Sequence, residues 1–484
     1  MEEYLEEELT EPVSPMGQCL NNTSLCSYIL AFLEFEVPIH DLPIVSLVED
    51  AFLSIPHFTS IMVNDERGVK RWKQVEVKLE EHIIEPKLID DGISVDLYDK
   101  HFADYISRMA LEKLPPTKPL WQVHVFKYPT SNAAGTLVFK LHHAIGDGYS
   151  LMSVILSSLQ RADDPSLPLS FPSSRKSSKP NKFSRLFLNK MPQFLSIPFN
   201  SVSEFGSSLL KSTLLEDDKT PIRSGVEAVE FRPTKLSNVT FSIDHIKQIK
   251  SNLGVTINDV ITGIIFYGIR LYMQDVDYRS RTLNSTALVI ASTRHIKDYQ
   301  RVQDMMLKTA KSAWGNRITY YHVSIPKLED IPISNPLQFV MKAHTSIKRK
   351  NNSFAPLLVT KLLQMKVKFE GPEVVAKYVH NTLRKSSLII SNVVGPIEQM
   401  AWANHPIGGF SFTLAGFPQH NLLSLLQSLV ITIMSYMGVL RVTSSTEEGF
   451  IDEQKLMQYM NKAFEIIRHE SIAKENIPKW NDFF

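Results

Sequence analysis

The chain has 484 residues, of which 43% are hydrophobic and 21% are charged. This length exceeds what one hydrophobic core usually serves, so two domains are predicted. Lysine and arginine number 52 against 51 aspartate and glutamate, which excludes the basic excess of a nucleic-acid-binding protein. Two cysteines exclude a disulfide scaffold and a structural zinc site built on cysteine, and no metal site is predicted.

Residues 1–162 are predicted to form an N-terminal domain, because short strand-like and helix-like segments alternate from about residue 13 to residue 159. The first eight residues are acidic and lack the apolar run of a secretory signal peptide. We therefore expect the chain to face the cytosol.

Residues 163–224 are predicted to be a linker rich in serine and proline. Basic residues between 175 and 190 occur there without acidic ones, interleaved with phenylalanine and leucine. Such a segment suits a membrane surface, where cations meet anionic headgroups and apolar side chains enter the interface. The alternative is a solvated linker whose apolar residues pack on the domains. Its seven prolines predict short helical segments and no long uninterrupted helix.

Residues 225–484 are predicted to form a C-terminal domain. A helix is expected over 256–273, with Thr256 and Asp259 as a capping box and with Gly263 and Gly268 allowing close packing. Continuous apolar runs at 287–291 and 388–390 predict buried strands, and a last amphipathic helix is expected over 453–468.

The longest charge-free stretch, residues 422–440, is just long enough to span a bilayer. It contains several serine, threonine and glutamine residues, and Ile431, Thr432 and Ile433 alternate as in a strand. Buried strands are therefore favoured over a transmembrane helix, which stays the alternative.

The most informative segment has the pattern H-H-x-x-x-D-G, with His142, His143, Asp147 and Gly148. A strand-like run precedes it and a helix-like run follows it, so it forms a strand-to-helix turn in which Asp147 caps the helix and Gly148 suits the bend. Adjacent strand residues point to opposite faces, so the two histidines should do different jobs. One histidine can act as a general base near neutral pH. The alternative is a packed histidine pair with a capping aspartate.

Other nucleophile schemes are missing from the sequence. There is no G-x-S-x-G elbow, no Walker-type phosphate loop and no complete G-x-G-x-x-G. The chemistry most consistent with one histidine base is direct acyl transfer between two substrates, without a covalent enzyme intermediate.

The H-H-x-x-x-D-G pattern resembles the active-site motif of the coenzyme A-dependent acyltransferase superfamily, which includes the plant BAHD enzymes. Four further segments resemble plant wax ester synthase/diacylglycerol acyltransferases: E-P-V-S-P-M-G at 11–17, P-L-W at 119–121, N-D-V at 258–260 and S-N-V-V-G-P at 391–396. They span almost the whole chain in the family's order. The D-F-G-W-G motif of the BAHD branch is absent.

This resemblance implies an α+β fold of two chloramphenicol-acetyltransferase-like domains, with mixed β-sheets flanked by helices and a substrate tunnel at their interface. It implies that His143 is the base and that Asp147 is mainly structural, with Arg294 as its expected partner. It also implies fatty acyl-CoA as a substrate, a long-chain alcohol or diacylglycerol as the acceptor, and no separate cofactor. The expected location is the cytosolic face of the endoplasmic reticulum membrane, or the plasma membrane.

Three further residues carry weaker predictions. Asn258 and Asn392 are proposed to donate hydrogen bonds to the oxyanion, although an asparagine serves equally as a cap or turn residue. Trp121 is predicted to line the acyl path, with a buried aromatic on a strand as the alternative. Two other functions stay open: a soluble BAHD-like transferase acting on small acceptors, and a lipid-binding protein without turnover.

Overall fold

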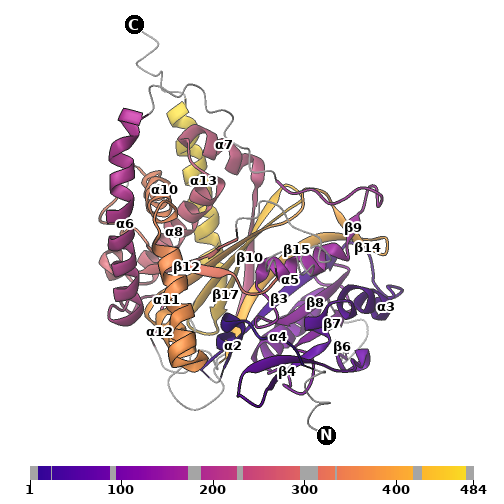
Figure 1. Ribbon diagram of the computed structural model, residues 1–484. Helices are drawn as coiled ribbons and strands as arrows, with labels where there is room; N and C mark the ends of the chain where they lie inside the picture. The colour runs from indigo at the N-terminus through magenta and orange to yellow at the C-terminus, as the bar shows by residue number, and fades with distance from the viewer. Residues whose placement is uncertain are drawn as a thin grey trace.

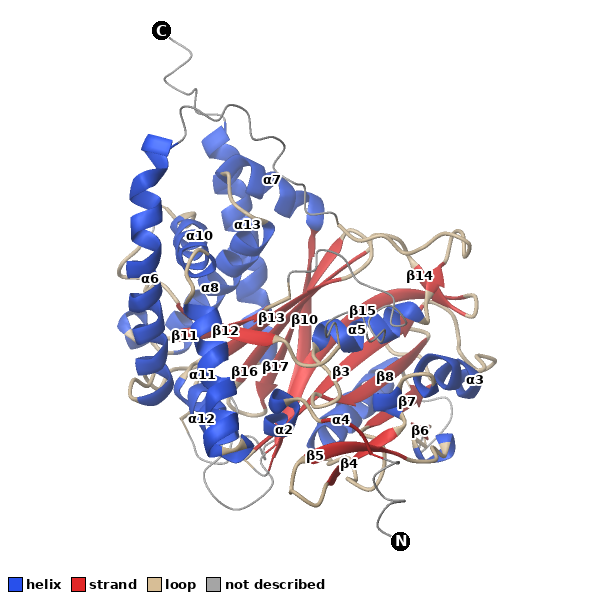
Figure 2. Cartoon of the chain, viewed as in Figure 1, coloured by secondary structure: helices blue, strands red, loops and turns tan. Residues whose placement is uncertain are grey.

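Two mixed β-sheets lie side by side and are flanked by helices (Figures 1 and 2). The computed structural model describes residues 9–22, 24–87, 94–172, 187–225, 233–294, 314–332, 335–417 and 428–475. Each sheet has its own large apolar core, so the expected α+β architecture of two domains is confirmed.

The N-terminal sheet has the strand order β6-β7-β8-β3-β15-β14-β9, and β2 pairs with β3 at its side. Its strands are β6 (Ile83–Ile84), β7 (Trp121–Phe126), β8 (Gly135–His142), β3 (Leu25–Phe35), β15 (His405–Phe417), β14 (Met400–Trp402), β9 (Gln160–Arg161) and β2 (Asn21–Asn22). A small sheet beside it contains β1 (Leu9–Pro12), β5 (Lys70–Gln74) and β4 (Ser60–Asn64).

Helices cover both faces of the N-terminal sheet. On one face, α4 (Val95–Leu111) packs on Leu30 and Phe32 of β3. On the other face, α5 (Gly148–Ser157) joins the main core through Leu151 and Val154. The remaining short helices of this half are α2 (Pro15–Leu20), α3 (Ile44–Val48), η1 (Glu49–Leu53), η2 (Pro56–Phe58) and η3 (Leu79–Glu81).

Strand β15 belongs to the N-terminal sheet although it comes from the second half of the chain. It pairs antiparallel with β3, from Ile407 opposite Phe35 to Phe417 opposite Cys26, and β14 beside it pairs with β9. The predicted division at residue 225 is therefore wrong for residues 400–417. The pairing of β15 with β3 covers a strand edge that β3 would otherwise expose, and it connects the two halves of the chain.

The C-terminal sheet has the strand order β10-β17-β16-β13-β11-β12. Its strands are β10 (Thr234–Ser242), β17 (Val439–Glu447), β16 (Leu429–Tyr436), β13 (Leu388–Val394), β11 (Thr286–Ser292) and β12 (Ile318–Ser324). The predicted strands at 287–291 and 388–390 are thus confirmed, and each is longer than predicted.

The central helix of the second half is α8 (Ile257–Val276), which packs against α13 (Glu453–Glu475), α10 (Gln338–Asn351) and α7 (Ile243–Leu253); the 3-10 helix η5 (Tyr278–Thr282) follows it. The capping box of Thr256 and Asp259 is present. A Cβ on Gly263 would meet the Val340 backbone at 2.6 Å, and one on Gly268 would meet Met460 at 2.9 Å. Both glycines therefore permit the predicted close packing.

Strands β16 and β17 form a hairpin, which confirms the buried-strand prediction for residues 429–440. Met437 and Gly438 both have positive φ at the turn, as a tight two-residue hairpin requires. Residues 422–427 of the charge-free stretch lie outside the described residues. Among the residues described, no single helix is long and apolar enough to cross a bilayer, and α7 with α8 meets that test only as a pair bent by 100°.

The predicted linker contains a long helix, α6 (Phe187–Thr213), so the expectation of short segments alone is wrong. It runs along the second half beside α11 (Ala355–Glu370) and α12 (Pro372–Lys385) (Figure 1). A proline inside a helix costs about 3 kcal/mol, yet α6 continues through Pro192 and Pro198. The basic run from Arg175 to Arg185 lies outside the described residues.

Candidate active site

The histidine motif forms the predicted turn between β8 and α5. Strand β8 ends at His142, and α5 begins at Gly148 with Asp147 as its N-cap. The Asp147 carboxylate accepts a hydrogen bond from the Ser150 backbone N–H at 3.1 Å. The His143 backbone N–H donates to the Ser27 carbonyl at 2.8 Å, which fixes the turn against β3.

His142 points into the core of the N-terminal half. Its Nδ1 accepts from the Ala144 backbone N–H at 3.0 Å, so the ring proton is on Nε2, which lies 3.3 Å from the Cys26 sulfur. Tyr28 packs edge-on against the ring. Burial lowers the pKa of His142 to about 3, so the ring is neutral at physiological pH. His142 is therefore a packing residue, and it does not line the cavity described below.

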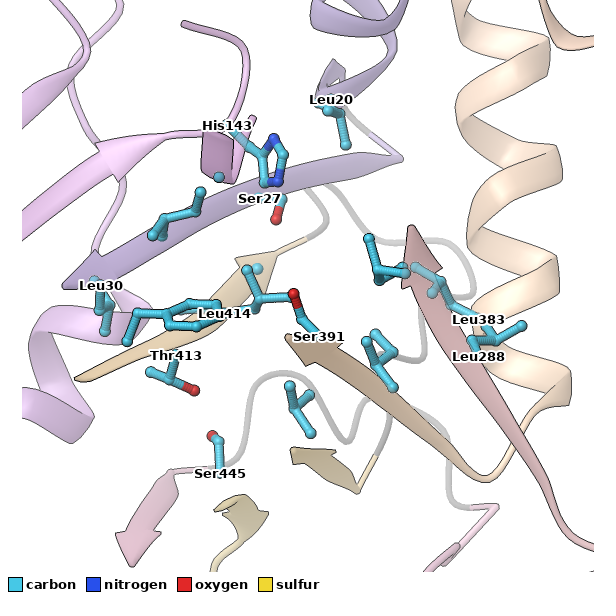
Figure 3. A pocket seen from close by; sticks show the side chains of 18 of the residues that line it. Leu20, Ser27, Leu30, His143, Leu288, Leu383, Ser391, Thr413, Leu414 and Ser445 are labelled. Atoms are coloured by element: carbon cyan, nitrogen blue, oxygen red, sulfur yellow. The ribbon is translucent and has the colours of Figure 1, made fainter. Parts of the chain in front are cut away.

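His143 points the other way, into a cavity between the two halves of the chain (Figure 3). The histidines thus occupy different environments, as their alternation along the strand predicts. Burial lowers the pKa of His143 below the ordinary value, while the charge of Asp147 and the hydrogen bond that the ring donates to Asn316 act in the opposite direction. The imidazole is therefore neutral, and able to accept a proton, at neutral pH.

Asn316 decides which nitrogen of His143 carries the proton. Its amide Nδ2 donates to the His143 carbonyl at 2.8 Å, and a carbonyl only accepts. The amide is thereby oriented with Oδ1 toward the imidazole, 2.9 Å from Nδ1. Nδ1 must donate this bond, so Nε2 holds the free lone pair. Asn316 is a positioning residue that was not predicted from the sequence.

Replacing Asn316 with alanine should lower kcat about tenfold, because one net hydrogen bond of about 1–1.5 kcal/mol holds the productive tautomer. Asn316→Asp keeps an acceptor at Nδ1 and adds a negative charge, so it should raise the pKa of His143 and move the acidic limb of the pH–rate profile to higher pH. A purely structural role for Asn316 would leave the position of that limb unchanged.

Asp147 is held by a buried ion pair with Arg294, as predicted. Their side chains are 1% and 2% exposed, respectively. The Asp147 carboxylate also accepts from the Arg317 backbone N–H at 2.8 Å, and Arg294 donates to the Ser150 hydroxyl at 3.1 Å and to the Gly315 carbonyl at 2.6 Å. These bonds of the Asp147 carboxylate join the histidine turn to the second half of the chain, which is the structural role that was predicted for Asp147.

The cavity is large and mainly aliphatic. It contains about 1730 Å³ of empty space, its mouth included. Figure 3 shows His143 and Ser27 at one side, Leu288 and Leu383 at another, and Thr413 and Ser445 farther along. Both halves supply walls, mainly from β3, β15, α4, β12, β13 and α12. A long alkyl chain and a reacting group at the imidazole fit such a space. Gly148 also lines it, where a Cβ would meet Val393 at an ordinary 3.8 Å.

Trp121 does not line this cavity, so that prediction is wrong. It is fully buried in the N-terminal core, where its indole N–H donates to the Phe58 carbonyl at 2.8 Å. It stacks on His82 with ring centroids 4.2 Å apart and meets Phe52 edge-on. The alternative, a packed aromatic on a strand, describes Trp121 correctly.

Asn258 and Asn392 are not placed to stabilise an oxyanion. They are exposed, the Asn392 side-chain amide donates to the side-chain Oδ1 of Asn258 at 2.6 Å, and neither lines the cavity. Ser391, the preceding residue of β13, does line it, so alternation turns Asn392 to the other face of the strand. Both predictions are therefore corrected, and the pair links α8 to β13.

Residues 314–317 form a clamp on the histidine turn that the sequence did not reveal. Trp314 donates to the Ile145 carbonyl at 3.0 Å, Asn316 holds His143, and Arg317 donates its backbone N–H to Asp147. These residues are about 170 positions away in the chain, and their contacts depend on the docking of two domains. The sequence signal at this position is Asn316 next to Gly315. Glycine and asparagine are common in loops, so this pair does not indicate a contact with His143.

Two solved acyltransferases share this two-domain fold. The fold of this chain is similar to that of the wax ester synthase/diacylglycerol acyltransferase of Marinobacter aquaeolei VT8, with a TM-score of 0.57 and 13% identity over 95% of this chain and 100% of that one. The trichothecene 15-O-acetyltransferase TRI3 of Fusarium sporotrichioides has the same fold, with a TM-score of 0.55 and 12% identity over 95% of this chain and 94% of that one.

Family models give the finer assignment. The wax ester synthase/diacylglycerol acyltransferase catalytic domain matches residues 66–261, and the C-terminal domain of that family matches residues 314–468. The chain therefore belongs to the wax ester synthase/diacylglycerol acyltransferase family and is an O-acyltransferase. Wax ester synthase/diacylglycerol acyltransferase 4 of Arabidopsis thaliana is 27% identical over 98% of this chain and 93% of its own length. Member 2 of that series is 28% identical over 92% of both chains.

Proposed function

We propose that this chain transfers a fatty acyl group from acyl-CoA to a long-chain alcohol, to diacylglycerol or to both, with His143 as the general base. The observation that supports this proposal is the oriented imidazole: Asn316 holds the proton on Nδ1, and the ring lies in the wall of a large aliphatic cavity. No separate cofactor enters the proposed reaction, and acyl-CoA is a substrate.

The proposed reaction needs one proton acceptor that later acts as a donor. Nε2 of His143 takes the proton of the bound hydroxyl, and the alkoxide oxygen attacks the carbonyl carbon of the thioester. The carbon–sulfur bond then breaks, and the imidazolium returns its proton to the departing CoA sulfur. Such acid–base catalysis contributes about 10²–10⁴-fold, and alignment of both substrates in the cavity supplies much of the rest.

We favour wax ester over triacylglycerol as the main product. A linear alcohol presents one alkyl chain and one terminal hydroxyl to a cavity with aliphatic walls, whereas diacylglycerol must also place two acyl chains. Diacylglycerol is the second acceptor in the proposal. A BAHD-like enzyme for small acceptors would have little use for so large an apolar lining.

The test is product analysis with labelled palmitoyl-CoA and three acceptors: hexadecanol, a diacylglycerol and a short water-soluble alcohol. The proposal predicts labelled hexadecyl palmitate, with or without triacylglycerol. Ester formed with the short alcohol alone would favour the BAHD-like alternative. Retention of palmitoyl-CoA without any ester would identify a lipid-binding protein and contradict the proposal.

The proposed location is a membrane surface, since the substrates are lipids. We propose the cytosolic face of the endoplasmic reticulum membrane, with the plasma membrane as the alternative. Fractionation of cells that express a tagged chain distinguishes them: co-migration with a luminal or secreted marker would contradict both.

A further inference from the structure

Helix α11 carries a line of exposed apolar side chains. Phe354, just before the helix, and Leu357, Leu358, Met365 and Phe369 all lie on its outer side, and Phe369 is 74% exposed. Phe354, Leu358, Met365 and Phe369 are separated by four, seven and four residues, which keeps them on one helical face, and Leu357 lies at the edge of that face. A helix normally buries such a face, whereas these five side chains are between 39% and 74% exposed.

The apolar surface continues onto helix α6, which lies beside α11 (Figure 1). A shallow groove between them is lined by Val202 of α6 together with Phe354, Leu357 and Leu358. About one third of the exposed large hydrophobic side chains in the described chain lie on α6 or on α11 with the preceding Phe354. Elsewhere in the described chain such side chains are scattered.

The same region is positively charged. Residues 355–385, which make up α11 and α12, contain six lysine or arginine residues against two glutamates. Lys361 and Lys368 lie within the exposed line itself, and the ammonium group of Lys368 lies over the Phe369 ring. Lysines of this kind extend their charges past an apolar surface toward anionic headgroups. A surface that binds another protein is usually rich in aromatic residues and poor in lysine, so the lysines on α11 favour lipid over a protein partner.

The inner face of α11 belongs to the wall of the catalytic cavity. Leu363 lines the cavity, and with Val359 it packs against Leu20 and Leu25, of which Leu20 lies on α2. Both of these leucines also line the cavity. One helix therefore has the exposed apolar line on one side and the cavity on the other.

We propose that the outer face of α11, with Val202 of α6, docks on an anionic lipid surface. The phenylalanine, leucine and methionine side chains enter the interface, and Lys361 and Lys368 meet the headgroups. Docking in this orientation places α11 between the lipid and the cavity, next to the source of an apolar acceptor. This last consequence rests on the proposed function, whereas the docking itself does not require turnover.

The experiment is cosedimentation of the full chain with vesicles of phosphatidylcholine alone or with phosphatidylserine. The triple variant Leu357→Gln/Met365→Gln/Phe369→Gln should lower the partition coefficient by about tenfold or more, because each exposed side chain loses its transfer into the interface. The matched control is Val45→Gln/Leu97→Gln/Tyr278→Gln, three comparably exposed residues on other elements, which should bind as the parent does. Lys361→Gln and Lys368→Gln should each cost about fivefold on anionic vesicles and little on neutral ones.

Several results would overturn the inference. Equal binding by the parent and the α11 triple variant would do so, as would an equal loss in the control variant. Loss of binding through charge reversal of Lys176, Lys179, Lys182 and Arg185, with the α11 variant unaffected, would assign docking to the linker instead. A parent dimer that the triple variant dissociates, without vesicle binding, would assign the face to self-association. Failure of ester synthesis with intact vesicle binding would contradict the proposed function alone.

Discussion

Replacing His143 with alanine should lower kcat by about 10²–10⁴-fold, the usual contribution of a general base. The variant should still bind palmitoyl-CoA, because the cavity walls that would hold the chain are aliphatic side chains on other elements. His143→Gln can keep a hydrogen bond to Asn316 but cannot accept the alcohol proton as readily, so it should be similarly impaired. The measurement is single-turnover ester formation beside acyl-CoA binding.

His142 is the matched control for this prediction, since it is the adjacent residue and does not line the cavity. His142→Asn removes the contact with the Cys26 sulfur and the ring packing on Tyr28. It should lower the melting temperature and leave the turnover of the folded fraction near that of the parent. If His143→Ala turned over as fast as the parent, or His142→Asn lost equal activity without loss of stability, the assignment of the base would be wrong.

Replacing Arg294 with alanine should destabilise the protein by about 3–5 kcal/mol, because it leaves the Asp147 carboxylate buried without its cation. The loss also removes the donors to Gly315 and Ser150, so the clamp on the histidine turn should loosen and turnover should fall. Urea denaturation measures the first effect, and activity of the folded fraction measures the second.

Arg294→Lys and the double variant Arg294→Met/Asp147→Asn make this prediction specific. Lysine keeps the charge but not the planar fork, so an intermediate loss is expected. The double variant removes both charges. Its loss of unfolding free energy should therefore be smaller than the sum of the losses in Arg294→Met and Asp147→Asn. Strict additivity would show that the two side chains do not act as a buried pair. Lys247→Ala, which breaks an exposed pair with Asp244, serves as the surface control and should be nearly neutral.

Local signals allowed several elements to be predicted from the sequence. The capping box of Thr256 and Asp259 involves residues three apart, so its pattern is visible without the fold. The turn around Asp147 and the opposite directions of His142 and His143 follow from the geometry of a strand that leads into a helix. The Arg294 pairing came from the family resemblance and from no local pattern.

Features that depend on tertiary docking were missed. Strand β15 joins the N-terminal sheet because β3 offers a free edge there, and nothing in residues 405–417 specifies that partner. Helix α6 continues through two prolines against their local propensity, and its packing along α11 and α12 has no signal in the local sequence. Asn316 approaches His143 only after the two halves meet.

Three incorrect site predictions have a common cause. Trp121, Asn258 and Asn392 were assigned from motif membership, but a motif residue can be retained for packing as well as for chemistry. Trp121 fills the core under η1 and η2, and the two asparagines link α8 to β13. Which face of a strand meets the cavity depends on register, and the short motif does not reveal it.

The pH dependence of kcat/KM tests the central claim, that a buried neutral imidazole takes the alcohol proton. The active form is unprotonated, and burial lowers the pKa of His143 from the ordinary value of 6.5. The rate should therefore be constant through neutral pH and fall with unit slope only below about pH 6.5, as the ring becomes protonated. An acidic limb with a midpoint above 6.5, or a rate that does not change as the pH is lowered through the acidic range, would contradict the account.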